Sequence, residues 1–303
     1  MRDLQAVPNR AVTLVVLIGA AVCLGMTTTL AKLAGNHAVA PAGFVFWSLA
    51  GATLVLLIHA VRNGQRPKVS LRHLEYYLIA GLVSAAGPNL IFFSAIPVVG
   101  AAYVSFILSL PPLLTYLGAL ALGMERFDAW RFSAVLAALT GTGWLAAGQL
   151  GTPNMPAFWI VFPILGPVLL SIGNLYRSLR WPAGASPVAL TPGMTGAAVL
   201  LIGLAGSGQS RFQLAIALDT KTVVLLCAQA ALFAAQFLLL FILQRRGGPV
   251  FLSLLGGVAA IFAVPVAIFL LGEPRPQHML PSVVGIATGV IILAARRAQS
   301  RPA

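Results

Sequence analysis

Acidic residues are scarce in this sequence. Only six of its 303 residues are Asp or Glu, and charged residues of either sign make up 8% of the chain, against roughly a quarter in soluble domains. The mean hydropathy is +0.95 and 59% of the residues are hydrophobic. A soluble globular domain is therefore excluded, and the sequence predicts a chain embedded in a lipid bilayer.

Cysteines and long polar segments are nearly absent as well. Cys23 and Cys227 fall inside apolar stretches, which favours packing roles over a disulfide or a metal pair. The longest gaps between apolar stretches, near 62–73 and 206–220, are too short for a domain with its own core. No metal-ligand set, phosphate-binding loop or catalytic constellation falls at mid-helix. We therefore expect neither an enzyme nor a bound cofactor or metal.

Basic residues outnumber acidic ones by nineteen to six. In a soluble protein this excess would suggest a nucleic-acid partner. Here the basic residues lie between apolar segments, where they set membrane topology. The expected partners are the lipid bilayer and a small-molecule solute, with no nucleic acid. The sequence does not determine the oligomeric state, and a monomer is compatible with it.

Apolar runs predict an all-α integral membrane protein with ten transmembrane helices. Each run approaches the length of about 20 residues that a bilayer core requires. The expected helices cover residues 11–31, 41–61, 74–94, 98–121, 131–149, 155–178, 187–205, 221–243, 249–271 and 281–296.

The placement of Lys and Arg predicts that both termini are cytoplasmic, because these residues concentrate in short cytoplasmic loops. Four would lie outside: Lys32, Arg211, Lys221 and Arg275. Fifteen would lie inside: Arg2, Arg10, Arg62, Arg66, Lys68, Arg72, Arg126, Arg131, Arg177, Arg180, Arg245, Arg246, Arg296, Arg297 and Arg301.

The chain also repeats itself. Residues 125–147 match residues 273–295 at an offset of 148, with Thr140-Gly141 falling on Thr288-Gly289. The sequence thus predicts two five-helix halves, 1–150 and 151–303. An odd number of helices in each half places the copies in opposite orientations, and such inverted repeats are typical of transporters.

A short motif follows the fourth helix of each half, Gly123-Met124-Glu125 and Gly272-Glu273-Pro274, and a Gly-rich fifth helix comes next. This pattern resembles the drug/metabolite transporter superfamily in its ten-helix EamA-domain branch, and most closely the aromatic-amino-acid exporters of the YddG type. The resemblance implies a bacterial inner-membrane protein that exports small neutral metabolites, chiefly aromatic amino acids. The second half departs from the first, because it lacks a counterpart to Pro111-Pro112 and carries Pro265 instead.

Ionisable groups are missing from the predicted helix centres. The six acidic residues all map to helix ends or loops, and the four histidines do so too. The acidic residues are Asp3, Glu75, Glu125, Asp128, Asp219 and Glu273. Proton-coupled carriers usually need an ionisable group within the membrane. We therefore expect a neutral path that carries a zwitterionic or apolar solute by alternating access, with no evident proton-carrying residue.

Mid-helix polar residues, with aromatic rings near them, are the candidates for binding a solute. They are Thr28, Asn89, Tyr103, Ser105, Trp159, Asn174, Gln229, Phe233, Gln236 and Ser253. Buried amides need hydrogen-bond partners and should face the bundle interior. Helix-to-helix pairing is the alternative for the polar residues, and packing or interface anchoring is the alternative for the aromatic ones. The repeat makes Asn89 nearly equivalent to Gln236.

Helix breakers mark four further places: Gly87-Pro88, Pro111-Pro112, Gly166-Pro167 and Pro265. Each removes a backbone hydrogen bond and forms either a static kink or a gating hinge. Glu125 and Glu273 precede the last helix of each half, where we expect them to cap its N-terminus. Contact with the substrate is the alternative.

Another substrate class remains open, namely a drug, a nucleoside or a lipid-linked sugar. A phosphate-bearing substrate would require basic side chains in the cavity to bind its negative charge. The sequence offers only Lys32 and Arg180 for that purpose, both near predicted helix ends.

Overall fold

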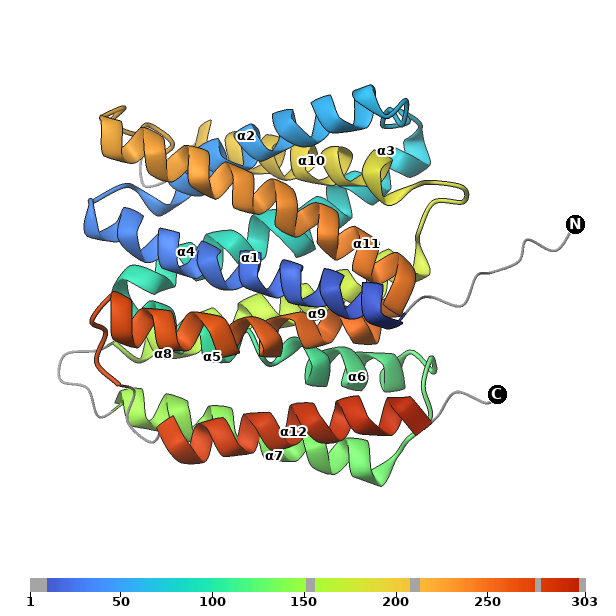
Figure 1. The fold of residues 1–303 in the computed structure, drawn as a ribbon, viewed down its shortest axis with the longest axis vertical. Coiled ribbons are helices and arrows are strands. Elements are labelled where there is room, and N and C mark those ends of the chain that lie inside the picture. The colour runs from blue at the N-terminus through green and yellow to red at the C-terminus, as the bar shows by residue number, and fades with distance from the viewer. Residues whose placement is uncertain (1–9, 151–155, 208–212, 276–278, 300–303) are drawn as a thin grey trace, which may run out of the picture.

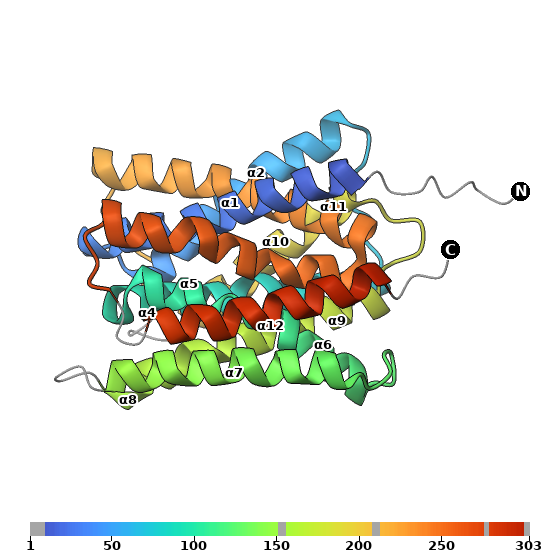
Figure 2. The ribbon, with the colours of Figure 1, turned by 60° about the horizontal axis from the view of Figure 1, so that its bottom comes forward.

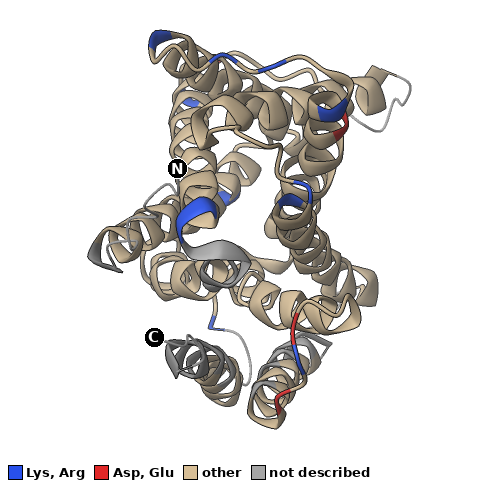
Figure 3. Cartoon of the chain, turned by 90° about the vertical axis from the view of Figure 1, so that its right-hand side faces the viewer, with Lys and Arg blue, Asp and Glu red and all other residues tan. Residues whose placement is uncertain are grey.

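The computed structural model describes residues 10–150, 156–207, 213–275 and 279–299. Within these ranges the regular structure is helical throughout, with no strand. The helices run back and forth along one direction and stack into a bundle, and the start of α1 and the end of α12 lie at the same end of it (Figure 1). Figure 3 views the bundle from that end, where Lys and Arg segments are more frequent than Asp and Glu segments.

The first half of the chain contains seven α-helices and one π-helix, η1. Their bounds are α1 Arg10–Asn36, α2 Pro41–Arg62, α3 Leu71–Gly81, η1 Leu82–Ala86, α4 Gly87–Val99, α5 Ala101–Ile107, α6 Pro111–Ala121 and α7 Ala129–Leu150. The second half contains α8 Ala157–Val161, the 3₁₀ helix η2 Phe162–Ile164, α9 Leu165–Leu179, α10 Pro187–Ser207, α11 Thr220–Pro265, the π-helix η3 Val266–Leu270 and α12 Met279–Gln299.

Seven helical stretches among the described residues are long and apolar enough to cross a membrane. They are Val12–Asn36, Pro41–Arg62, Leu71–Val99, Ala101–Ala121, Ala157–Leu179, Pro187–Ser207 and Thr220–Arg246. Shorter apolar helices cover Phe132–Gly141, Leu255–Leu270 and Met279–Thr288, which overlap the other three ranges expected from the sequence. Seven spans are thus supported by length and composition, and the count of ten stays a prediction.

Element α11 doubles back on itself. Two glycines of α1 contact its two parts: Gly19 lies against Leu239, and Gly25 lies against Ala259. The two glycines are about 9 Å apart along α1, whereas Leu239 and Ala259 would be about 30 Å apart in a straight helix. A straight α11 cannot make both contacts. Figure 1 shows the orange first part and the red-orange second part crossing the molecule as separate helices, as the sequence predicted for residues 221–243 and 249–271.

The predicted helix breakers coincide with irregular backbone. Gly87-Pro88 begins α4 directly after the π-helix η1, and Pro265 ends α11 directly before the π-helix η3. Pro111 begins α6 after the helix is broken at residues 108–110, and Gly166-Pro167 follows the 3₁₀ turn η2. Proline cannot donate the i→i−4 hydrogen bond, so the backbone leaves regular helical geometry near it.

Two pairs of helices from opposite halves pack side by side: α2 with α10, and α7 with α12. Figures 1 and 2 both show α12 beside α7. Between this pair, a Cβ added to Gly141 would lie 2.8 Å from the Ser282 carbonyl oxygen and 3.2 Å from the Cα of Gly285. Only small residues allow two backbones to approach so closely.

Glu273 caps a helix, but not the one expected from the sequence. Its Oε1 accepts a hydrogen bond from the Ala101 amide at 2.8 Å, and its Oε2 accepts one from the Ala102 amide at 2.9 Å. Both donors are N–H groups of the first turn of α5, which has no earlier carbonyl to bind. The expectation that Glu273 caps the helix at 281–296 is therefore wrong, because the chain folds this carboxylate toward α5. The corresponding expectation for Glu125 stays a prediction.

Candidate functional site

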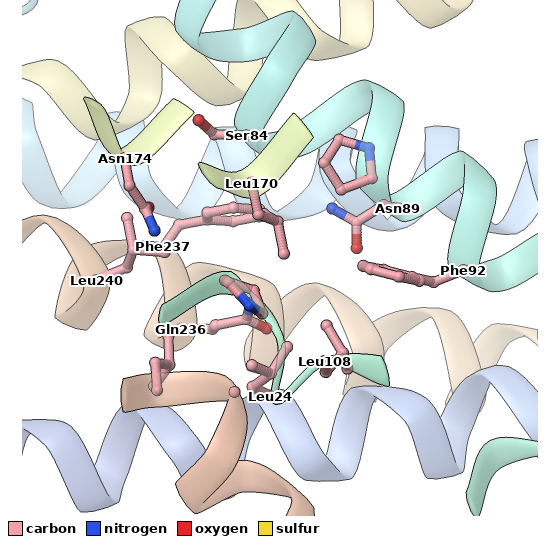
Figure 4. A pocket seen from close by; sticks show the side chains of 14 residues that line it. Leu24, Ser84, Asn89, Phe92, Leu108, Leu170, Asn174, Gln236, Phe237 and Leu240 are labelled. Carbon is pink, nitrogen blue, oxygen red and sulfur yellow. The ribbon is translucent and has the colours of Figure 1, made fainter. Parts of the chain in front are cut away.

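A cavity lies where α1, α4, α9 and α11 meet the break between α5 and α6. Four polar residues line it: Ser84, Asn89, Asn174 and Gln236. The other ten lining residues are apolar, proline or glycine. Figure 4 shows Asn89, Asn174 and Gln236 approaching the same space from separate helices. The cavity thus combines a mostly apolar wall with a few convergent polar groups, as small-molecule sites do.

The cavity is narrow in this conformation. The volume open to the centre of a water-sized sphere is ≈ 50 Å³, and by the same measure one water needs about 10–15 Å³. A few waters fit, whereas a solute of ten or more heavy atoms does not. Binding such a solute would require the lining helices to move apart.

Three of the predicted solute-binding residues come together here. The Asn89 Nδ2 donates to the Ala85 carbonyl oxygen at 2.7 Å, in the turn that precedes it. Gln236 is buried, and among the described residues its Oε1 has no hydrogen-bond donor. Asn174 belongs to a larger hydrogen-bonded cluster around Arg177. The near-equivalence of Asn89 and Gln236 inferred from the repeat is consistent with their shared position on the cavity wall.

The broken helix contributes residues to the same wall. Leu108, in the break between α5 and α6, lines the cavity together with Pro111 and Gly256. A Cβ on Gly256 would overlap the carbonyl oxygen of Leu108. Glycine at position 256 therefore allows the second part of α11 to lie directly against the break. Discontinuous helices of this kind form the substrate sites of many secondary transporters.

Arg177 is a buried charge that the sequence analysis did not anticipate. It lies in the last turn of α9 and is 1% exposed, and its expected place on the cytoplasmic side of the membrane stays a prediction. Its Nε donates to the Gln244 Oε1 at 2.7 Å, its Nη2 donates to the Asn174 Oδ1 at 2.9 Å, and its Nη1 donates to the Ser84 Oγ. The Phe241 ring also lies near it, with its centroid 5.9 Å from the guanidinium carbon.

This arrangement brings a fixed positive charge to the edge of the cavity. Asn174 and Ser84 each touch the guanidinium on one side and line the cavity on the other. The sequence analysis considered only the missing acids and histidines and did not anticipate this buried charge, and the expectation of a neutral path stays a prediction. The available sequence signal was the three-residue spacing of Asn174 and Arg177, which puts both on one helix face.

Thr28, Ser105 and Tyr103 lie outside the cavity lining and make contacts within the bundle. The Thr28 and Ser105 hydroxyls are 3.3 Å apart, and each also donates to a carbonyl of its own helix. Tyr103 donates to the Ile160 carbonyl oxygen at 2.9 Å. These contacts join α1, α5 and α8, as the helix-pairing alternative expects. Their role in solute binding stays a prediction.

Gln229, Phe233 and Trp159 are also away from the cavity lining. Gln229 is fully buried, and among the described residues neither of its amide atoms has a partner. Phe233 packs between Phe93 and Phe237, with ring centroids 5.8 and 5.7 Å away. Trp159 is half-buried and meets neighbouring phenylalanine rings edge to face. The side chain of Ser253 lies outside the described residues.

Comparisons with known proteins agree with this architecture. Residues 11–147, which run from α1 into α7, match the EamA-like transporter family. No curated protein matches the chain significantly. Among solved structures, 25 chains match. One, described only as "Crystal structure of protein", has a TM-score of 0.66 and 19% identity, and the alignment covers 94% of this chain and 98% of that one. This likeness shows the fold alone. The apolar helices and the family match together identify a multi-pass membrane protein.

Proposed function

We propose that this chain, whose residues 11–147 form an EamA-like transporter domain, is a carrier that moves a small organic solute across the bilayer by alternating access. The observation that carries the proposal is the cavity between broken helices inside an apolar bundle. Three amides from α4, α9 and α11 converge there. Polar groups are expensive within a membrane and mark solute pathways when they face the interior.

The narrowness of the cavity supports a mechanism in which the helices change conformation during transport. A fixed pore would stay open to both sides, whereas this cavity leaves ≈ 50 Å³ for a water-sized sphere. The irregular segments η1 and residues 108–110 border it. Segments without regular helical hydrogen bonding can absorb changes in backbone angles, so we assign them the role of hinges.

The two halves of the carrier, 1–150 and 151–303, are inferred to be inverted five-helix repeats. The packing of α2 against α10 and of α7 against α12 supports this inference. A two-fold axis in the membrane plane would bring such equivalent helices together. The same proposal includes ten membrane-spanning helices, a location in a bacterial inner membrane, and both termini on the cytoplasmic side of that membrane.

For the substrate we propose a neutral amino acid, exported from the cell, with aromatic ones favoured. The cavity's apolar wall, which includes Phe92 and Phe237, suits an apolar or aromatic side chain of the amino acid. The amides of the cavity suit the amino and carboxylate groups of the same solute. The YddG-type resemblance supports the aromatic preference. Carriers for a drug, a nucleoside or a lipid-linked sugar are the alternative, and a substrate panel separates them.

The test is counterflow into proteoliposomes that contain the purified full-length chain. Labelled phenylalanine should accumulate when the vesicles are preloaded with an amino acid that the carrier accepts, scanned over all twenty. Asn89→Ala and Gln236→Ala should each raise the half-saturation concentration about three- to tenfold, the range for loss of one neutral hydrogen bond. Asn63→Ala, which removes an exposed amide after α2, is the matched control. Unchanged kinetics in both cavity variants would remove these residues from the site.

A further inference from the structure

Arg177 is a buried cation without a buried anion. Among the residues that the structure describes, no carboxylate lies within 4.0 Å of its guanidinium. Its hydrogen-bond partners Ser84, Asn174 and Gln244 are all neutral. Charged side chains within a membrane are costly and usually pair with an opposite charge. The site thus carries one uncompensated positive charge beside the cavity.

The guanidinium also orients its neighbours. Because Arg177 donates to the Asn174 Oδ1 and the Ser84 Oγ, one acceptor position on each of these oxygens is occupied. The Asn174 Nδ2 donates one hydrogen to the Thr115 Oγ1 at 3.4 Å, so these two groups can still offer the cavity the second Asn174 amide hydrogen and the Ser84 hydroxyl hydrogen. Hydrogen bonds in such a chain polarise one another. This end of the cavity is therefore rich in donors as well as positively charged.

We propose that this end, formed by Arg177, Asn174 and Ser84, is an anion-docking site that takes the carboxylate of the transported solute. The proposal rests on the transporter function proposed above and specifies its substrate class. The solute's carboxylate supplies the missing charge, either by replacing Asn174 as an acceptor for Arg177 or by binding the donors that Arg177 orients. The unpartnered Oε1 of Gln236, which also lines the cavity, is an acceptor for the solute's ammonium group.

The charge count favours a carboxylate over a phosphate. One guanidinium neutralises one carboxylate, whereas a phosphate monoester carries about −1.5 to −2 charges at neutral pH and recruits clusters of basic groups. Arg180, the next basic residue, is exposed at the end of α9 and is not part of the cavity lining. A phosphate would therefore keep an uncompensated negative charge inside the bundle.

The experiment compares ligands that differ only in their polar end. The thermal unfolding of the purified full-length chain in detergent is measured with phenylacetate, phenylacetamide, phenethylamine and phenyl phosphate at equal concentrations. Phenylacetate should raise Tm, and its isostere phenylacetamide should not. The apparent affinity difference should be about ten- to hundredfold, the range for a hydrogen bond to a charged group.

Variants then locate the effect. Arg177→Gln should abolish the phenylacetate shift. Because that variant can also destabilise the fold, Asn174→Asp provides a second test, since it places a carboxylate against the Nη2 that already binds Asn174. This variant should fold and should also lose the phenylacetate shift. Arg180→Gln removes the same charge outside the cavity and should keep the shift.

Each outcome bears on one proposal. Equal shifts with phenylacetate and phenylacetamide, no shift with either, or a shift retained in Arg177→Gln would overturn the docking site. A larger shift with phenyl phosphate than with phenylacetate would overturn the carboxylate assignment. Counterflow of phenylalanine is measured separately on the same preparation. Absence of counterflow would contradict the assignment as an amino acid carrier, whereas counterflow without a preference of the binding site for phenylacetate over phenylacetamide would contradict only the docking site.

Discussion

Lys32 and Glu273 lie 3.5 Å apart, from Nζ to Oε1, and join the end of α1 to the segment between η3 and α12. The same carboxylate binds the first two amides of α5. Gly100, directly before α5, has a φ of +87°, and a Cβ there would lie 3.0 Å from the Glu273 Oε2. Three segments distant in sequence are thus held together by one side chain at the end of the bundle.

Glu273→Gln should lower the stability of the protein. An amide has only one acceptor oxygen for the two backbone donors, and Lys32 loses its partner charge. The expected loss is about 1–3 kcal/mol, because buried donors are left unsatisfied. Thermal unfolding in detergent measures it. Glu75→Gln changes an exposed acid and should stay within about 0.5 kcal/mol of the parent. Equal Tm values for the two variants would contradict the structural role of Glu273.

Gly256→Ala should disrupt the bundle where the second part of α11 meets the broken helix. The new methyl group would overlap the Leu108 carbonyl oxygen, which is backbone and cannot rotate away. Overpacking typically costs about 1–3 kcal/mol, and a clash with backbone lies at the upper end. Gly143→Ala in α7 is the matched control, because no heavy atom lies within 4 Å of its added Cβ. Size-exclusion profiles that are alike for both variants would argue against this contact.

Asp219 should make α11 sensitive to acid. It caps the helix by accepting from the Lys221 and Thr222 amides at 2.9 and 3.0 Å and from the Thr222 hydroxyl at 2.8 Å. The bonds from Thr222, chiefly the backbone one, lower the pKa of the Asp219 carboxyl below its ordinary value. A lowered folded pKa contributes stability above the unfolded pKa of about 3.9 and loses it as pH falls through the folded pKa.

Asp219→Ala should therefore lower Tm at pH 7, and its difference from the parent should shrink as the pH falls below about 4. Asp219→Asn keeps a good N-cap without a titrating group, so its Tm should lack this contribution to the pH dependence. Melting curves from pH 3 to pH 7 measure both. A constant difference between the alanine variant and the parent across this range would contradict the capping role.

The topology is tested with single cysteines in a chain that carries Cys23→Ala and Cys227→Ala. Ser186 donates to the Gln65 Oε1 at 2.6 Å, so the loops after α2 and before α10 share one end of the bundle. A cysteine at Gln65 should be shielded from impermeant thiol reagents in intact cells, and one at Ala217 should be labelled. Labelling at position 65 from outside would overturn the cytoplasmic assignment of the termini.

Local features of the chain were predicted well because they depend on local physics. The apolar runs became helices since the backbone must satisfy its own hydrogen bonds in lipid. Pro88, Pro111 and Pro265 mark irregular backbone because proline lacks the donor that a helix needs. Asn89, Asn174 and Gln236 line one cavity, as their polarity in apolar helices suggested.

Long-range contacts were not predictable in the same way. Arg177 sits near the end of a helix, where arginine usually marks a cytoplasmic loop. Its partners Ser84 and Gln244 are 93 and 67 residues away along the chain, and no sequence spacing connects them. Glu273 likewise binds α5 rather than the helix that follows it. In both cases the tertiary fold, and not the local pattern, decides which groups a charge meets.

The measurement that tests the central claim most directly is phenylalanine counterflow in proteoliposomes, run with and without a pH step across the membrane. Among the residues that the structure describes, Glu273 is the only buried carboxylate, and Lys32 and two backbone amides hold it. With no free acid to carry a proton through the bundle, we predict uptake down the phenylalanine gradient at the same initial rate under both conditions. A strict requirement for the pH step would contradict uncoupled transport, and the absence of counterflow under both conditions would contradict the assignment as an amino acid carrier.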